Sequence, residues 1–246
     1  MNQKPLPGRH RGIYLLPNLF TTGAMFAGFY AIIAALNNRF ETAAMAMFIA
    51  MVLDGLDGRV ARLTNTQSEF GVQYDSLSDM VSFGVAPALV MYLWALSSMG
   101  QVGLFAAFVH MAGAALRLAR FNTQVEVADK RYFQGLPSPA AAAILAGGLW
   151  FCVENDYNPQ SIKYLVLLTT IASGLLMVSN FRYSSFKEIN LRDKVPFIVA
   201  IVAMLVLGFI MAQPQRMLFL LALGYALSGP IVTLVMRKKR LQSRKA

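Results

Sequence analysis

Apolar segments of membrane-spanning length recur along the whole chain, and this recurrence constrains the fold more than any other feature. Hydrophobic residues make up 57% of the 246 positions, more than is usual in soluble domains. A helix needs about 20 mostly apolar residues to cross a bilayer. The sequence therefore predicts an all-α fold, a polytopic membrane helical bundle with about eight transmembrane helices at residues 15–36, 42–61, 78–97, 101–121, 137–154, 162–180, 195–212 and 216–236.

The positions of the basic residues predict how such a bundle is oriented. With both termini on the inner side, only Arg39, Lys163 and Arg216 of the 22 lysines and arginines fall outside. An excess of basic residues marks the cytoplasmic side of a membrane protein. We therefore expect a cell inner membrane protein whose polar N-terminus (1–14) and basic tail (237–246) are both cytoplasmic.

The net charge of +10 raises the alternative of nucleic-acid binding, and the C-terminal run MRKKRLQSRK carries much of that charge. The run directly follows an apolar span, where each basic residue adds about 1 kcal/mol of attraction to an anionic membrane surface. It is therefore interpreted as an inner-leaflet anchor, with membrane lipid and not nucleic acid as its partner. A single cysteine, Cys152, excludes an intrachain disulfide. All residues, 1–246, are assigned to one integral-membrane domain.

Four carboxylates gather at the edges of the second and third apolar segments. Asp54 and Asp57 are three positions apart and Asp75 and Asp79 are four apart, so each pair shares one helical face. A charged side chain in the membrane interior costs roughly 2.5–3.5 kcal/mol on insertion scales, and like charges also repel one another. Carboxylate oxygens suit hard divalent cations. The spacing predicts a cation site between two facing helices; the alternative is a set of solvated acids balanced by neighbouring arginines.

The pattern D-x-x-D-G-x-x-A-R, eight residues, G-x-x-x-D-x-x-x-D runs without departure through this region, on Asp54, Asp57, Gly58, Ala61, Arg62, Gly71, Asp75 and Asp79. It resembles the signature of the CDP-alcohol phosphotransferase family. That resemblance implies an enzyme that joins a lipid-linked or nucleotide-linked phosphate to an alcohol and releases CMP. It also implies a homodimer, a divalent cofactor (Mg²⁺ or Mn²⁺), metal binding by all four aspartates, and Asp79 as the catalytic general base.

Contacts to CDP-diacylglycerol follow from the same resemblance. The segment P-N-L-F-T, residues 17–21, is similar to the family's Asn-x-x-Thr nucleotide contact, although Asn18 also suits a helix N-cap. Glycines within the signature would let cytidine pack against the backbone. The residues implied to bind CDP-diacylglycerol are Asn18, Thr21, Gly58, Arg62, Ser68 and Gly71.

Four further motifs bear on the acceptor alcohol: MVSFGVAPA at 80–88, ALRLARFN at 115–122, QGLPSP at 134–139 and RYSSFK at 182–187. They are similar to the branch of the family that uses L-serine. A guanidinium matches a carboxylate bidentately, so Arg117 and Arg120 are candidates for holding serine, against the alternative of snorkelling arginines. Asn122 and Lys187 complete the serine-binding candidates, with a solvated interfacial lysine as the alternative for Lys187.

Two other functions remain open at this stage. The same scaffold can use a different acceptor, such as glycerol-3-phosphate, inositol phosphate or choline. Ser76 and Met80 stand where the glycerol-3-phosphate branch usually has Pro and Lys, which argues against that acceptor. A cation transporter also uses intramembrane acids, but the acids here cluster at one membrane face.

Several small motifs are interpreted as structural. His110 lies in the middle of a span without another histidine or a cysteine nearby and is expected to be a hydrogen-bonded core residue. Pro137 suits the first turn of a helix. The small residues Gly23, Ala24, Ala27 and Gly28 are expected to pack helices and not to bind a ligand.

Overall fold

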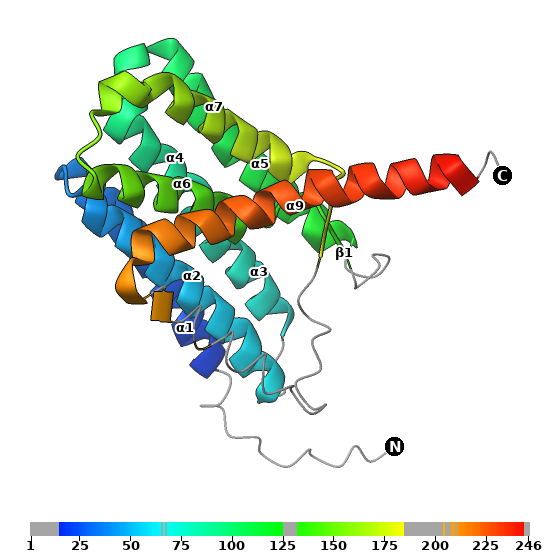
Figure 1. Ribbon diagram of the computed structural model, residues 1–246. Coiled ribbons are helices and arrows are strands. Elements are labelled where there is room, and N and C mark those ends of the chain that lie inside the picture. Colours follow the sequence, from blue (N-terminus) through cyan, green and yellow to red (C-terminus); the bar gives the residue numbers. More distant parts are fainter. Residues whose placement is uncertain are drawn as a thin grey trace, which may run out of the picture.

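The protein is a helical bundle in the computed structural model, which describes residues 15–64, 66, 68–124, 132–184, 204, 208–209 and 211–243 (Figure 1). The helices are α1 (Leu15–Leu36), α2 (Phe40–Leu63), α3 (Glu69–Asp79), α4 (Ala86–Met91), α5 (Gln101–Gln124), α6 (Ser138–Glu154), α7 (Pro159–Val178) and α9 (Pro214–Ser243). The predicted all-α class is confirmed. The sequence did not predict two short antiparallel strands, β1 (Tyr132–Gln134) and β2 (Arg182–Ser184).

Helix α3 is the start of a longer helical rod in which the hydrogen-bond pattern changes several times. The π-helical segments η2 (Met80–Val85) and η3 (Tyr92–Leu96) flank α4, and a short 3-10 turn, η4 (Ser97–Met99), ends the rod. Single π-helical turns inside α-helices often occur at functional sites. Here η2 begins directly after Asp79.

Five of the described helices are long and apolar enough to cross a membrane: Pro17–Leu36, Glu69–Met99, Gln101–Thr123, Pro159–Val178 and Pro214–Thr233. The apolar helix α6 is shorter. Helix α2, where a span was predicted at 42–61, has sufficient length, but its second half carries acidic and basic side chains and it is not among these five. The span predicted at 195–212 lies mostly outside the described residues.

One predicted boundary is wrong. The third span was predicted to begin at residue 78, whereas α3, the helix that leads into it, begins at Glu69. The Ser68 side chain accepts a hydrogen bond from the Gly71 backbone N–H at 3.0 Å, which satisfies a free donor of the first turn. Glu69 adds a negative charge at the positive end of the helix. With these local signals, the helix begins at residue 69, nine residues before the apolar span that was predicted to begin at residue 78.

Small residues bring the first helices close together. Ala31, Ala35 and Ala43 are fully or almost fully buried where α1 and α2 meet. A Cβ atom on Gly28 would lie 2.7 Å from the Cα of Ser82, so only glycine permits this contact between α1 and η2. The prediction that the Gly23–Gly28 stripe packs helices is confirmed.

A second core joins α9 to the strand pair. The buried Tyr183 of β2 donates from its hydroxyl to the Ala226 carbonyl of α9 at 3.0 Å, and Gly229 leaves room for its ring. Gly135 follows β1 with φ of +77° and lies against the Met177 carbonyl. The motif that contains Gly135 then opens α6, as predicted, but Pro137 is the N-cap, and the proline in the first turn is Pro139.

His110 connects three parts of the bundle and is fully buried. Its Nε2 lies 3.1 Å from the Phe83 carbonyl of η2, and its Nδ1 lies 2.7 Å from the Ser173 hydroxyl of α7. A carbonyl only accepts, so Nε2 carries the proton. The expectation of a hydrogen-bonded core histidine is confirmed.

Candidate active site

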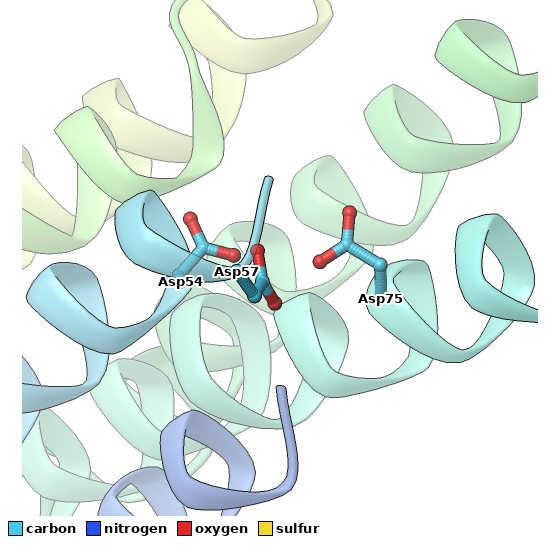
Figure 2. Close-up of side chains that lie close together, drawn as sticks. All are labelled: Asp54, Asp57 and Asp75. Carbon is cyan, nitrogen blue, oxygen red and sulfur yellow. The ribbon is translucent and has the colours of Figure 1, made fainter. Parts of the chain in front are cut away.

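The aspartate cluster is assembled by the helices on either side of one short connection. Asp54 and Asp57 lie near the end of α2, and Asp75 lies in α3. Figure 2 shows these three side chains directed toward a common space. Each offers a carboxylate oxygen within 4.8 Å of the others. The predicted i,i+3 pair on one helix therefore meets the partner helix, as the spacing indicated.

Asp79 lies one turn further along α3, beside this group of three. Its charge interacts with those of Asp54, Asp75 and Asp57. The Oδ1 atoms of Asp75 and Asp79 are buried and have no hydrogen-bond partner among the described residues. A buried polar atom without a partner is costly, and more so when it is charged. A divalent cation would satisfy such oxygens, so the donor set fits a metal of the hard, oxygen-liganded kind.

Helix α1 contacts the aspartate cluster through hydrogen bonds of one residue. The Thr21 hydroxyl donates to Oδ2 of Asp57 at 2.7 Å, and Ser78 of α3 donates to the Thr21 carbonyl at 2.9 Å. One residue of α1 therefore contacts both acid-bearing helices. Thr21 was predicted to contact the nucleotide lipid, and in the structure its hydroxyl fixes a carboxylate.

Three of the other predicted nucleotide contacts converge at the start of α3. Gly71 lies beside the Ser68 hydroxyl, and a Cβ atom on Gly71 would be 3.9 Å from Oδ1 of Asn18. The N-cap interpretation of Asn18 is wrong, because α1 already begins at Leu15. Since the helix starts earlier, Asn18 is free to present its side chain toward α3.

The remaining two predicted contacts to CDP-diacylglycerol, Gly58 and Arg62, lie at the exposed end of α2. A Cβ atom on Gly58 would meet nothing within 4 Å, so packing within the described chain does not explain why this position has no side chain. Arg62 is exposed and donates from Nε to the Gly58 carbonyl at 2.9 Å. This face of α2 therefore exposes the backbone at Gly58 next to the guanidinium of Arg62.

The two arginines of α5 differ in their surroundings. Arg117 Nη1 donates to the carbonyls of Gln134 and Gly135 at 3.2 and 3.3 Å, which ties α5 to β1. Arg120 Nη1 is buried and has no hydrogen-bond partner among the described residues. Both residues were candidates for holding serine, and of the two only Arg120 has a buried donor without a partner among the described residues.

Of the other two serine-binding candidates, the structure describes only one. Asn122 donates to the Ser76 hydroxyl at 3.1 Å and so connects α5 with α3. Lys187 lies outside the described residues. Sequence reasoning missed Tyr225 of α9, which lies near Arg117 at this end of α5. No local motif indicates that Tyr225 belongs here, because its proximity to α5 arises from packing between helices that are far apart in the chain.

Fold and site together define a class: a membrane protein with several membrane-length helices and a cluster of aspartates that could hold a metal ion. A family model for CDP-alcohol phosphatidyltransferases matches residues 14–176, a range that contains every aspartate of the cluster. The chain belongs to the CDP-alcohol phosphatidyltransferase family.

Curated relatives carry one common name. A Helicobacter pylori protein named CDP-diacylglycerol–serine O-phosphatidyltransferase is 40% identical over 196 residues, covering 79% of this chain and 82% of the relative. Proteins of the same name from Mycobacterium tuberculosis and Bacillus subtilis are 30% and 32% identical. They cover 90% and 70% of this chain, and 79% and 92% of their own lengths.

Proposed function

We propose that this protein transfers the phosphatidyl group of CDP-diacylglycerol to the hydroxyl of L-serine, giving phosphatidylserine and CMP. The observation that carries the proposal is the convergence of Asp54, Asp57 and Asp75 within 4.8 Å. The names of relatives that cover most of the chain support serine as the acceptor. Serine carries both a nucleophilic hydroxyl and a carboxylate, and the site offers a candidate partner for each.

The four aspartates are the proposed ligands of Mg²⁺ or Mn²⁺. The unpartnered oxygens of Asp75 and Asp79 support this assignment, as does the hard donor set. Metal binding at this cluster would supply charge neutralisation to the diphosphate and to the departing CMP. Thr21 holds Asp57 in place through its 2.7 Å hydrogen bond.

Asp79 is the proposed general base. The serine hydroxyl must lose its proton as its oxygen bonds to the phosphorus that bears diacylglycerol, while the bond from phosphorus to the CMP oxygen breaks. CMP leaves with that electron pair, and the proton moves to a carboxylate oxygen of Asp79. Asp79 would hold the metal through only one carboxylate oxygen, which leaves the other to accept the proton, because a metal-bound carboxylate oxygen is a poor base.

The nucleotide lipid is proposed to bind at the facing ends of α1, α2 and α3. Asn18, Ser68 and Gly71 lie together there, and the open backbone at Gly58 would accept the cytidine ring. Arg62 would contact phosphate from the edge. The acyl chains would extend into the membrane beside these helices.

The serine carboxylate is assigned to Arg120, and Arg117 is assigned a positioning role. Arg120→Ala is expected to raise the KM for serine roughly tenfold or more, since a hydrogen bond to a charged group contributes about 1.5–3 kcal/mol. The KM for CDP-diacylglycerol should change little. Steady-state kinetics of CMP release, with each substrate varied in turn, measures both values.

Arg117→Ala is the matched comparison. Its guanidinium holds two backbone carbonyls, so its loss should lower thermal stability and kcat without a selective effect on serine. If both variants raise the two KM values equally, Arg120 does not bind the carboxylate.

The membrane arrangement is proposed from the sequence pattern. Eight spans, both termini in the cytoplasm and a cytoplasmic active site in the cell inner membrane would follow from the bias of basic residues. This places the aspartates on the side where CDP-linked substrates are available. A single domain over 1–246 and a homodimer complete the proposal, the latter by resemblance to the family.

The acceptor is tested by offering several alcohols to the purified protein. With labelled CDP-diacylglycerol, CMP release should depend on L-serine and should remain at background with glycerol-3-phosphate, inositol phosphate or choline. Release with one of these alcohols and not with serine would reassign the acceptor within the family. Absence of CMP release with every alcohol would contradict the transferase assignment and reopen the cation-transporter alternative.

A further inference from the structure

An apolar cavity of about 270 Å³ lies between α6, α7 and α9. Trp94, Phe151, Cys152 and Phe219 contribute to its wall, and no charged side chain is among the described residues that line it. None of the four aspartates borders it. A cavity of this composition suits a hydrocarbon chain and not a polar ligand.

The cavity lies at the end of the bundle opposite the aspartate cluster. Its lining residues Trp94 and Val166 belong to the same core as Ala35 and Ala43, which flank the turn between α1 and α2. The acidic pair of α2 lies near the other end of that helix, and Figure 1 likewise shows α7 far from α3. The cavity is therefore separate from the proposed catalytic site.

The cavity also borders the hydrocarbon around the bundle. Leu165 of α7 lines it and is 59% exposed, and its neighbour Leu168 is 64% exposed. Both residues lie on a helix long and apolar enough to cross a membrane. An acyl chain can therefore enter sideways from the bilayer without crossing a polar surface.

A basic residue lies one helical turn from the wall of this cavity. Arg216 is in the first turn of α9, three residues before Phe219, whose ring stacks on Phe151 with centroids 6.1 Å apart. Its guanidinium donates to Oδ1 of Asn155 at 3.3 Å and to Oε1 of Gln213 at 2.9 Å. Both acceptors are neutral amides. The exposed carboxylates Glu154 and Asp156 flank Asn155 in the chain, but among the described residues neither forms an ion pair with Arg216.

We propose that the cavity binds one acyl chain of an anionic phospholipid whose phosphate contacts Arg216. The start of α9 lies where a candidate membrane span begins, which is the depth of lipid phosphates. Arg216 is also one of the few basic residues that the charge pattern assigns to the outer side, and lipid binding gives it a function there. The proposal does not depend on the catalytic activity.

Tryptophan fluorescence provides the test, because the chain has only two tryptophans. Trp94 lines the cavity, whereas Trp150 packs against Phe48 with ring centroids 6.1 Å apart. Trp150→Phe leaves Trp94 as the only reporter and retains an aromatic ring. This full-length variant is placed in phosphatidylcholine vesicles that contain a rising fraction of phosphatidylglycerol or phosphatidylcholine brominated on one acyl chain.

Brominated phosphatidylglycerol should quench Trp94 at an about fivefold lower mole fraction than brominated phosphatidylcholine, the preference that one basic side chain gives near anionic lipid. Adding Arg216→Gln, a surface change, should make the two quenching curves coincide. Gly148→Leu, which adds bulk at the cavity wall, should weaken quenching by both lipids. Gly224→Leu makes the same substitution at an open position on α9 and should have no effect.

Equal quenching of Trp94 by both lipids, with or without Arg216, would overturn the proposed phosphate contact. Absence of quenching by either lipid would overturn acyl-chain binding altogether and would indicate that another protein surface, such as a second copy, covers the cavity. Both results can be obtained from protein that has no transferase activity. Failure of this proposal is therefore distinguishable from failure of the proposed function.

Discussion

Asp79→Asn is expected to reduce kcat by about 10²–10⁴-fold, the range that a positioned general base contributes. Asparagine keeps the shape of the side chain but does not accept the proton of the serine hydroxyl. The change also removes one of four like charges, so the folded protein should not lose stability when metal is absent. Single-turnover CMP release and thermal unfolding measure the two effects.

Measuring CDP-diacylglycerol binding distinguishes a general base at position 79 from a residue that only supports the structure. The variant should bind CDP-diacylglycerol with an affinity close to that of the parent protein, as measured by equilibrium binding in the presence of Mn²⁺. Asp156→Asn is the matched control, because Asp156 is exposed and lies outside the cluster. Near-normal turnover by the Asp79 variant would refute its assignment as the base.

Chelation of divalent cations is expected to reduce CMP release to background, and added Mg²⁺ or Mn²⁺ should restore it. The reason is electrostatic: four adjacent carboxylates repel one another and would not bind a diphosphate without a compensating positive charge. Metal binding should also stabilise the folded state by about 2.7 kcal/mol when the free cation is at 100 times its Kd. Activity assays and thermal unfolding with and without each cation test this.

A variant with both Asp54→Asn and Asp57→Asn supplies the control for specific binding. These two residues provide one side of the group that lies within 4.8 Å, so the variant should lose most of the thermal shift caused by the cation. Full activity after complete removal of divalent cations would contradict the metal site and the mechanism that depends on it.

The sequence predicted the helical class because apolar length is a local property. It also predicted the shared face of Asp54 and Asp57, since that depends only on the 3.6-residue repeat of a helix. It placed the start of the third helix too late, because the hydropathy of residues 69–77 is low while the capping interaction of Ser68 is strong. Local polar contacts outweighed the apolar pattern at that boundary.

The sequence by itself therefore determined the helical class, which acids share a face and which family the signature resembles. The tertiary structure decided that Thr21 fixes Asp57 from 36 positions away. It also decided that Arg117 is hydrogen-bonded to backbone, while Arg120 has a buried donor without a partner among the described residues. The apolar cavity near the start of α9 is likewise a product of the tertiary structure. These features depend on how helices rotate and cross, which is set by packing between segments distant in the chain and not by the repeat within one helix.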